Sequence, residues 1–283
     1  MAKSTKKPTT KKAVAKNPVA KKVEKVVEVV EATEVVKVET VEVKDVNTET
    51  VEEIVENVEV LDVEKKVEPN IVPNRFITKN DKKVDKMIFD LEPNFWWSRL
   101  YEYALCLEMA SEGETVLDLC TGTYHPFKFA LLEKTNDVYA CDLADTSNKV
   151  VLEAIEKRFG TDALNSFDKK MLDDVKLSSQ DIVNLNYEDN MFDKIFCISA
   201  LEHLSVDVIK SGLKQIKRVL KNDGKVILTL DYPTLKPDTL ISIIEEVGLK
   251  VDGEFNYDIP SDAISSTYFG ETELKCYSIV LIK

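Results

Sequence analysis

From residue 75 onward, short apolar runs alternate along the chain with polar, turn-forming stretches. Runs of this length bounded by Gly, Asn and Asp predict buried strands. The predicted strands are 115–119, 137–142, a weaker one at 175–178, then 194–198, 225–231, 249–256 and 274–282.

Between these runs, apolar residues recur every three or four positions, which predicts helices with one buried face. The predicted helices are 127–134, 147–158, 162–174, 206–220 and 238–247, with Gly224 expected to end the fourth as a C-cap. Alternating strands and helices followed by a final strand pair predict an α/β fold. We expect a Rossmann-like, doubly wound, mostly parallel seven-stranded sheet with an antiparallel edge strand.

An earlier helix is predicted over 94–111, with Asn94 as its N-cap, and residues 79–91 are expected to form a short helix or loop. The apolar stripe of the predicted helix 94–111 contains Trp96, Leu100, Tyr103, Leu107 and Ala110. Trp97, Arg99 and Tyr101 lie off that stripe, where they either line a pocket or face solvent.

The first 74 residues have a different composition. Residues 1–22 contain eight lysines and no acid, which predicts a basic disordered tail that makes at most a weak contact with a polyanion. Residues 23–74 are rich in Val and Glu without a persistent period, which predicts an acidic disordered linker or, alternatively, a marginal helix that pairs with a partner. Residues 75–283 then form one folded domain.

Overall composition narrows the class of protein. The 283 residues carry a net charge of −13, and no apolar run is long enough to span a bilayer. The five cysteines form no C-x-x-C pair, so we expect buried reduced thiols and a cytoplasmic protein without membrane contact. The chain has two histidines, which makes a zinc site improbable, and we predict no metal.

Candidate chemistry is concentrated where the strand 115–119 ends. Asp118 precedes a Thr-Gly-Thr loop, and Pro126 opens the next helix. In open α/β sheets, ligands bind where such loops leave the carboxyl ends of the strands. Asp142, twenty residues past Gly122 and at the end of the next strand, stands where an acid accepts hydrogen bonds from ribose hydroxyls. The sequence therefore predicts an adenosyl-cofactor site.

Four segments in order resemble the class I S-adenosylmethionine-dependent methyltransferases. They are VLDLCTG (116–122), VYACDLAD (138–145), QDIVNLNYEDNMFDKIFCISALEHL (180–204) and IKRVLKNDGKVILTLDYP (216–233), and NFWWSRLYEY (94–103) is similar to the aromatic lead-in of some members. The sequence departs from the family's glycine loop at Cys120 and Tyr124, and we expect the Tyr124 ring to turn outward from the cofactor.

The resemblance implies S-adenosyl-L-methionine as cofactor and assigns roles to individual residues. Asp118 and the loop residues Cys120, Thr121, Gly122 and Thr123 would hold the methionine part. Asp142 would bind the ribose, with Leu143 against the adenine. Asp181 would accept from the adenine amino group, Ile182 would pack on the ring, and Ser199 would line the pocket near the sulfonium.

An acceptor hydroxyl would also profit from a base near its working pH. His203, Glu202 and His125 are the catalytic candidates, since all three fall in loops at the carboxyl rim. Each of the three could instead have a purely structural role. His125 could cap or pack the start of its helix, His203 could satisfy backbone groups, and Glu202 could be a favourable charge at a helix start. Tyr232, Thr267 and Tyr268 are further candidates for the acceptor pocket.

The function that fits these features is methyl transfer to a small-molecule, glycan or other exposed hydroxyl or amine acceptor. DNA-base methylation is set aside, because Ser-Ala-Leu-Glu-His (199–203) stands in place of the expected proline-rich signature. The alternative is a non-catalytic, methyltransferase-like scaffold or binding module that acts through the N-terminal arm. A nicotinamide dehydrogenase is a third possibility.

Removal of residues 1–70 should leave the thermal unfolding midpoint unchanged, because that region contains no aromatic residue and a single leucine, too few large side chains to build a core. Full-length and truncated proteins can be compared by circular dichroism melting. A clear fall in the midpoint of the truncated protein would show that the Val- and Glu-rich region packs on the domain.

Overall fold

The computed structural model describes residues 72–135 and 137–283. The predictions for residues 1–22, and for almost all of 23–74, therefore lie outside the described residues. No helix in the described part of the chain is long and apolar enough to cross a membrane.

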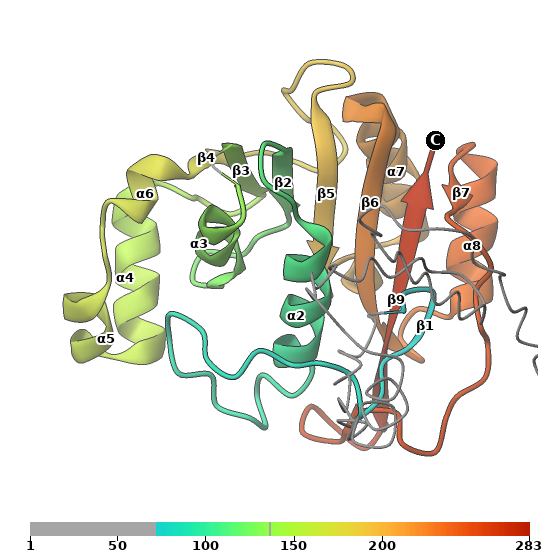
Figure 1. Ribbon diagram of the computed structural model, residues 1–283, viewed down its shortest axis with the longest axis horizontal. Helices are drawn as coiled ribbons and strands as arrows, with labels where there is room; N and C mark the ends of the chain where they lie inside the picture. Colours follow the sequence, from blue (N-terminus) through green and yellow to red (C-terminus); the bar gives the residue numbers. More distant parts are fainter. Residues whose placement is uncertain (1–71, 136) are drawn as a thin grey trace, which may run out of the picture. The chain divides into compact units, whose positions relative to one another are not determined.

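A single mixed sheet forms the centre of the domain, with strand order β1-β9-β6-β5-β2-β3-β4 (Figure 1). β2, β3, β4, β5 and β6 run parallel, and β9 runs antiparallel to its partners. The strands are β1 (Arg75–Phe76), β2 (Thr115–Leu119), β3 (Asp137–Asp142), β4 (Lys176–Ser179), β5 (Phe192–Ile198), β6 (Leu220–Tyr232), β7 (Lys250–Val251), β8 (Ser265–Ser266) and β9 (Leu274–Ile282). The predicted fold class is confirmed.

The antiparallel strand β9 is not the outermost strand. Residues of β6 pair along one side of it, and β8, β1 and β7 pair in succession along the other. The short strands β1 and β8 were not predicted, because two residues carry no periodicity, and the predicted strand 249–256 shrinks to β7.

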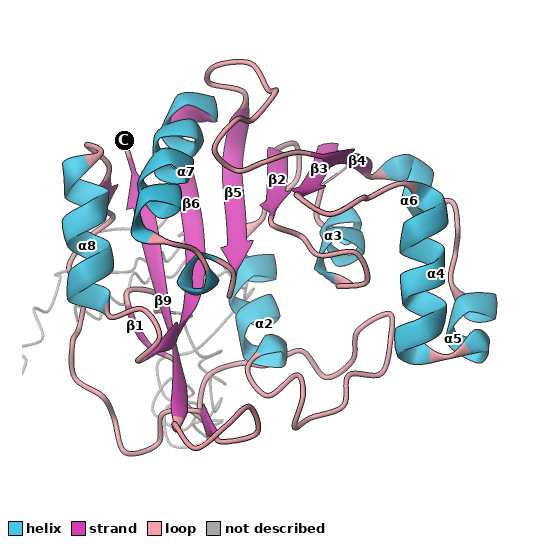
Figure 2. Ribbon diagram, turned by 180° about the vertical axis from the view of Figure 1, so that it is seen from behind, coloured by secondary structure: helices cyan, strands magenta, loops and turns pink. Residues whose placement is uncertain are grey.

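Helices cover both faces of the sheet (Figures 1 and 2). They are α2 (Arg99–Met109), α3 (Phe127–Ala130), α4 (Asn148–Phe159), α5 (Thr161–Ser166), α6 (Met171–Asp174), α7 (Val206–Val219) and α8 (Pro237–Glu246), with 3-10 turns η1 (Leu131–Glu133) and η2 (Leu201–His203).

Alternation along the strands divides the buried side chains into two cores. In β2, Leu117 and Leu119 pack with α7 and α8, whereas Val116 packs with α2, α3 and α4. β5 repeats the pattern, with Ile195 on the first face and Phe196 on the second. Because successive strand residues point to opposite faces, the ends of both strands are fixed between two helical layers.

Two predicted helix ends were wrong. α2 begins at Arg99 rather than after Asn94, because the Glu92 carboxylate accepts from the backbone N–H groups of Asn94 and Phe95 and holds that segment in turns. Gly224 is not a C-cap: α7 ends at Val219, and Gly224 lies within β6, where an added Cβ would be 3.0 Å from the Asp193 carbonyl oxygen. The predicted helix 162–174 is divided into α5 and α6.

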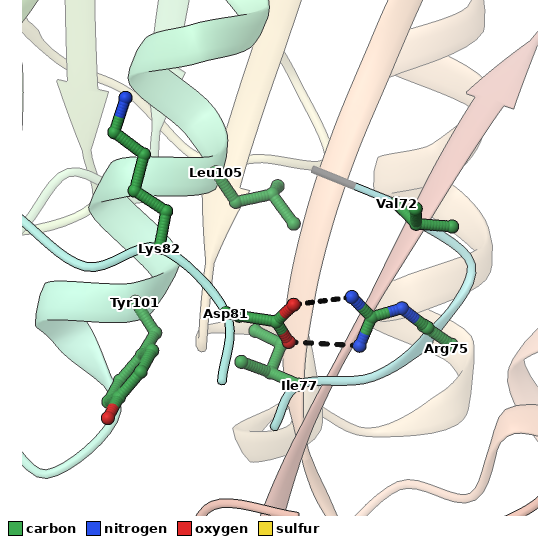
Figure 3. Close-up of a pocket in the computed structure, with 7 residues that line it drawn as sticks. All are labelled: Val72, Arg75, Ile77, Asp81, Lys82, Tyr101 and Leu105. Carbon is green, nitrogen blue, oxygen red and sulfur yellow. Dashed lines mark hydrogen bonds and ion pairs between the residues drawn. The ribbon is translucent and has the colours of Figure 1, made fainter. Parts of the chain in front are cut away.

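The start of the described chain is fastened to the sheet by polar contacts. Asn74 donates to the Asp252 carbonyl (2.7 Å) and accepts from the Val280 N–H (2.7 Å). The Arg75 guanidinium then forms two hydrogen bonds to the Asp81 carboxylate, at 2.9 and 2.5 Å (Figure 3). These contacts hold β1 against β9 and direct the following segment toward α2.

Candidate active site

The loop after β2 holds its shape with a buried acid. Asp118 is almost fully buried and accepts a hydrogen bond from the Thr121 hydroxyl. Cys120 (φ 58°) and Gly122 (φ 63°) both adopt the left-handed conformation, so Cys120 keeps a backbone shape that favours glycine. Thr123 is half-buried in the same loop.

Lys128 of α3 holds the two ends of this loop together. Its ammonium is fully buried and donates to the Gly122 carbonyl (2.9 Å) and to the His125 carbonyl (2.6 Å). Burial lowers the pKa of Lys128 to about 8 and raises the pKa of Asp118 to about 6, while the attraction between the two opposes both shifts. Lys128 thus places a positive charge beside Asp118.

Asp142 joins the loop to the end of β3. Its carboxylate accepts from the Gly122 N–H (2.9 Å) and from the Ala144 N–H (2.9 Å). Each carboxylate oxygen keeps a further lone pair for a ligand hydroxyl. Leu143 is 75% exposed beside it.

The two residues predicted to contact adenine lie differently. Asp181 is exposed, and its carboxylate accepts from the Val183 N–H at 3.1 Å. Ile182 is buried in the core, directly against Gly212 of α7, where an added Cβ would be 2.8 Å away. Its side chain is therefore packed between the sheet and α7.

Tyr124 and His125 belong to an aromatic cluster. The Tyr124 ring packs edge-on against Trp96 (6.1 Å between centroids), His125 (5.0 Å) and Phe159 (6.2 Å). Burial, together with Arg99 and other nearby cations, lowers the pKa of His125 to about 3. His125 thus remains neutral near pH 7, and its ring has a packing role beside any chemical one.

A buried carboxylate, Glu102 on α2, connects the helix to the ends of three strands. It is fully buried and bonded to Arg99 (2.5 Å). Its other oxygen accepts from the hydroxyls of Ser199 (2.6 Å) and Thr229 (2.6 Å), and the Cys276 thiol lies at 3.6 Å. Arg99 and these hydrogen bonds overcome burial and hold the pKa of Glu102 below its usual range. We did not predict this residue.

Two further acids lie at the same edge of the sheet. Glu202 follows β5 in η2, and Asp231 lies near the end of β6, with its N–H donating to Glu202 at 3.2 Å. Burial and repulsion by Asp231 raise the pKa of Glu202 to about 8, and burial and repulsion by Glu102 raise the pKa of Asp231 to about 7. His203 is exposed, and its pKa is lowered by partial burial and by Arg99.

The structure thus brings most predicted residues to the carboxyl ends of β2, β3, β5 and β6. Glu102, Lys128 and Asp231 were missed as site residues. Each was visible as a single charge within an apolar stretch: LYEYALCL (100–107), FKFALL (127–132) and VILTLDY (226–232).

Comparison with known proteins gives matches to part of the chain. Residues 117–228 match the family model described as a methyltransferase domain. A stretch of 49 residues is 45% identical to an uncharacterized protein from Methanocaldococcus jannaschii, covering 17% of this chain and 20% of that protein. The chain therefore matches about a fifth of the length of that curated relative.

Several solved structures have a similar architecture. A TehB-like SAM-dependent methyltransferase from Corynebacterium glutamicum is 16% identical with a TM-score of 0.46, covering 64% of this chain and 86% of that one. A SAM-dependent methyltransferase from Aquifex aeolicus is 20% identical with a TM-score of 0.43, covering 69% and 100%. Magnesium protoporphyrin IX methyltransferase from Synechocystis, with bound SAH, is 12% identical with a TM-score of 0.43, covering 64% and 80%.

The methyltransferase-domain match covers the strands that carry Asp118, Asp142 and Ser199. Residues 117–228 of the chain are thus a methyltransferase domain. This outcome agrees with the resemblance noted in the sequence and disfavours the nicotinamide dehydrogenase alternative.

Glu102→Ala should lower the free energy of unfolding by about 3–5 kcal/mol, because it leaves the largely buried Arg99 charge without its partner and the Ser199 and Thr229 hydroxyls without their acceptor. Glu102→Gln should lower it less, since the amide keeps an acceptor for Ser199 and Thr229. Urea unfolding measures both.

The matched control is Glu153→Ala, which removes a solvent-exposed glutamate of α4 that pairs with Lys149 at 3.9 Å. Such exposed pairs contribute roughly 0–1 kcal/mol. Equal effects of Glu102→Ala and Glu153→Ala would show that the buried network does not stabilise the domain.

Proposed function

We propose that this protein transfers a methyl group from S-adenosylmethionine to a small molecule, a glycan or another exposed hydroxyl or amine, at the carboxyl ends of β2, β3, β5 and β6. The observation that carries the proposal is the contact between Asp142 and Gly122, which joins the acid at the end of β3 to the left-handed loop after β2. An acid at the end of this strand, fixed against this loop, is the arrangement that binds an adenosyl ribose.

The surrounding residues fit the rest of the cofactor. Asp118 and the backbone of residues 120–123 would hold the methionine part, beside the ammonium of Lys128. Leu143 presents an exposed apolar surface for the adenine, and Asp181 keeps one carboxylate oxygen for the adenine amino group. Ile182 would contribute only as the buried wall behind the ring.

S-adenosylmethionine, when bound, supplies an electrophilic methyl group on a sulfonium. The task of the protein is then to align the acceptor and keep water away. Ser199, left-handed at φ 41° and held by Glu102, would form a fixed wall of that pocket at the end of β5.

Two wider features complete the proposal. The five cysteines are unpaired in the described residues, which suits a reducing, cytoplasmic compartment. The lysine-rich residues 1–22 would provide a weak contact for a polyanion, apart from the acceptor.

Asp142→Ala should weaken binding of S-adenosylhomocysteine by about tenfold or more, because the ribose hydroxyls lose a charged acceptor worth roughly 1.5–3 kcal/mol. Isothermal titration calorimetry measures the affinity. Asp145→Ala is the matched control, since this exposed acid three residues away accepts from the Ser147 backbone N–H. Unchanged affinity in folded Asp142→Ala protein would refute the ribose assignment.

Tyr124→Gly tests the alternative of a non-catalytic, methyltransferase-like module. Because the ring already packs against three aromatic partners, we expect removal to lower the melting temperature and leave S-adenosylhomocysteine affinity within a few-fold of wild type. The opposite result, binding by Tyr124→Gly but none by wild type at millimolar ligand, would mean that the ring fills the cofactor pocket. The scaffold function would then be favoured.

A further inference from the structure

Two buried acids, Glu202 and Asp231, each have one carboxyl oxygen without a hydrogen-bond donor in the described structure. Glu202 is 7% exposed and Asp231 is 8% exposed. Glu202 Oε2 and Asp231 Oδ1 are buried without any hydrogen-bond partner. An unpaired buried carboxyl oxygen is costly, so such groups are kept where a ligand completes them.

The neighbouring donors are committed elsewhere. Arg99, Ser199 and Thr229 all donate to Glu102. The Tyr277 hydroxyl donates to the Leu235 carbonyl at 3.1 Å. The charge is equally unbalanced, since Arg99 forms its ion pair with Glu102, and no ion pair to Glu202 or Asp231 is found among the described residues.

The position of the acid pair connects it with the proposed reaction. Glu202 follows Ser199 by three residues, and Asp231 follows Thr229 by two. Ser199 and Thr229 are adjacent across β5 and β6, with the Ser199 N–H donating to the Thr229 carbonyl at 2.9 Å. The acid pair therefore lies at the same strand ends as the proposed cofactor site, beside the residue assigned to its sulfonium end.

We propose that Glu202 and Asp231 together bind the protonated amino group of the methyl acceptor, which makes the acceptor an amine rather than an alcohol. This inference rests on the proposed function and names its substrate class. An ammonium group provides several N–H donors for the two unpaired oxygens, and its positive charge balances the buried acids.

Other ligand classes fit less well. An alcohol brings one donor and no charge, so it would leave one acid unpaired and the site still negative. A divalent cation usually needs more protein ligands, and the described residues contain no group of three or more His, Cys, Asp or Glu that could hold a metal.

The acid pair also supplies the proton acceptor that an amine requires. One N–H bond of the ammonium breaks, the proton passes to a carboxylate oxygen, and the electron pair stays on nitrogen as its nucleophilic lone pair. Burial raises the pKa of both Glu202 and Asp231, so an ionised carboxylate of this pair is a stronger base toward the proton than an ordinary surface carboxylate.

The test measures binding of methylammonium, the smallest amine probe, to the full chain by ¹³C NMR of the labelled methyl group. Titrations are run with and without saturating S-adenosylhomocysteine, at constant ionic strength, against potassium and methanol as controls. Glu202→Gln and Asp231→Asn should each weaken methylammonium binding by about tenfold or more. Asp207→Asn, an exposed acid at the start of α7, is the matched control and should change nothing.

Stability separates this role from a structural one. Since neither acid has a cationic partner, the neutral variants should melt at or above the wild-type temperature. The inference is overturned if methylammonium binds no better than potassium or methanol, if both variants bind it like wild type, or if only Mg²⁺ occupies the site. S-adenosylhomocysteine binding without amine binding refutes this inference alone, whereas amine binding without S-adenosylhomocysteine binding refutes the proposed function.

Discussion

The hydrogen bonds of the Glu102 carboxylate are the constraint on which the site depends. One fully buried side chain on α2 holds the hydroxyl of Ser199 after β5 and that of Thr229 in β6, and it lies against the Cys276 thiol of β9. These partners are 97, 127 and 174 residues away along the chain. Because the contacts converge on one side chain, α2 fixes where the ends of β5 and β6 lie relative to each other.

The same constraint accounts for the electrostatics of that edge. Arg99 is a cation near these acids, and it forms its ion pair with Glu102. For Glu202 and Asp231, the attraction of Arg99 only partly offsets the burial and repulsion that raise the pKa of both groups. Buried carboxyl oxygens without hydrogen-bond partners and carboxyl groups with raised pKa values are features of ligand sites, which agrees with the amine site proposed for Glu202 and Asp231.

Sequence patterns predicted the long strands well, because buried runs such as 137–142 and 274–282 have no competing interpretation. Local polar contacts were not predictable in the same way. Glu92 moved the start of α2 by capturing two backbone N–H groups. At the site, Asp142 lies at the strand end where its spacing placed it, but Glu102 was hidden because helical periodicity treats a charge off the apolar stripe as solvent-exposed. Its burial follows only from how the sheet and helix pack together.

Strand β9 has a consequence for how the protein forms in the cell. It pairs with β1, β6, β7 and β8, all of which precede it in the chain. In β1, for example, Arg75 pairs with Ser278, which is synthesised about 200 residues later. During translation, none of these four strands can complete its pairing until β9 has emerged from the ribosome. The apolar flank of β6 stays uncovered through that interval. Chaperones that shield exposed strands are thus expected to matter most for this protein in the interval before residues 274–282 have left the ribosome.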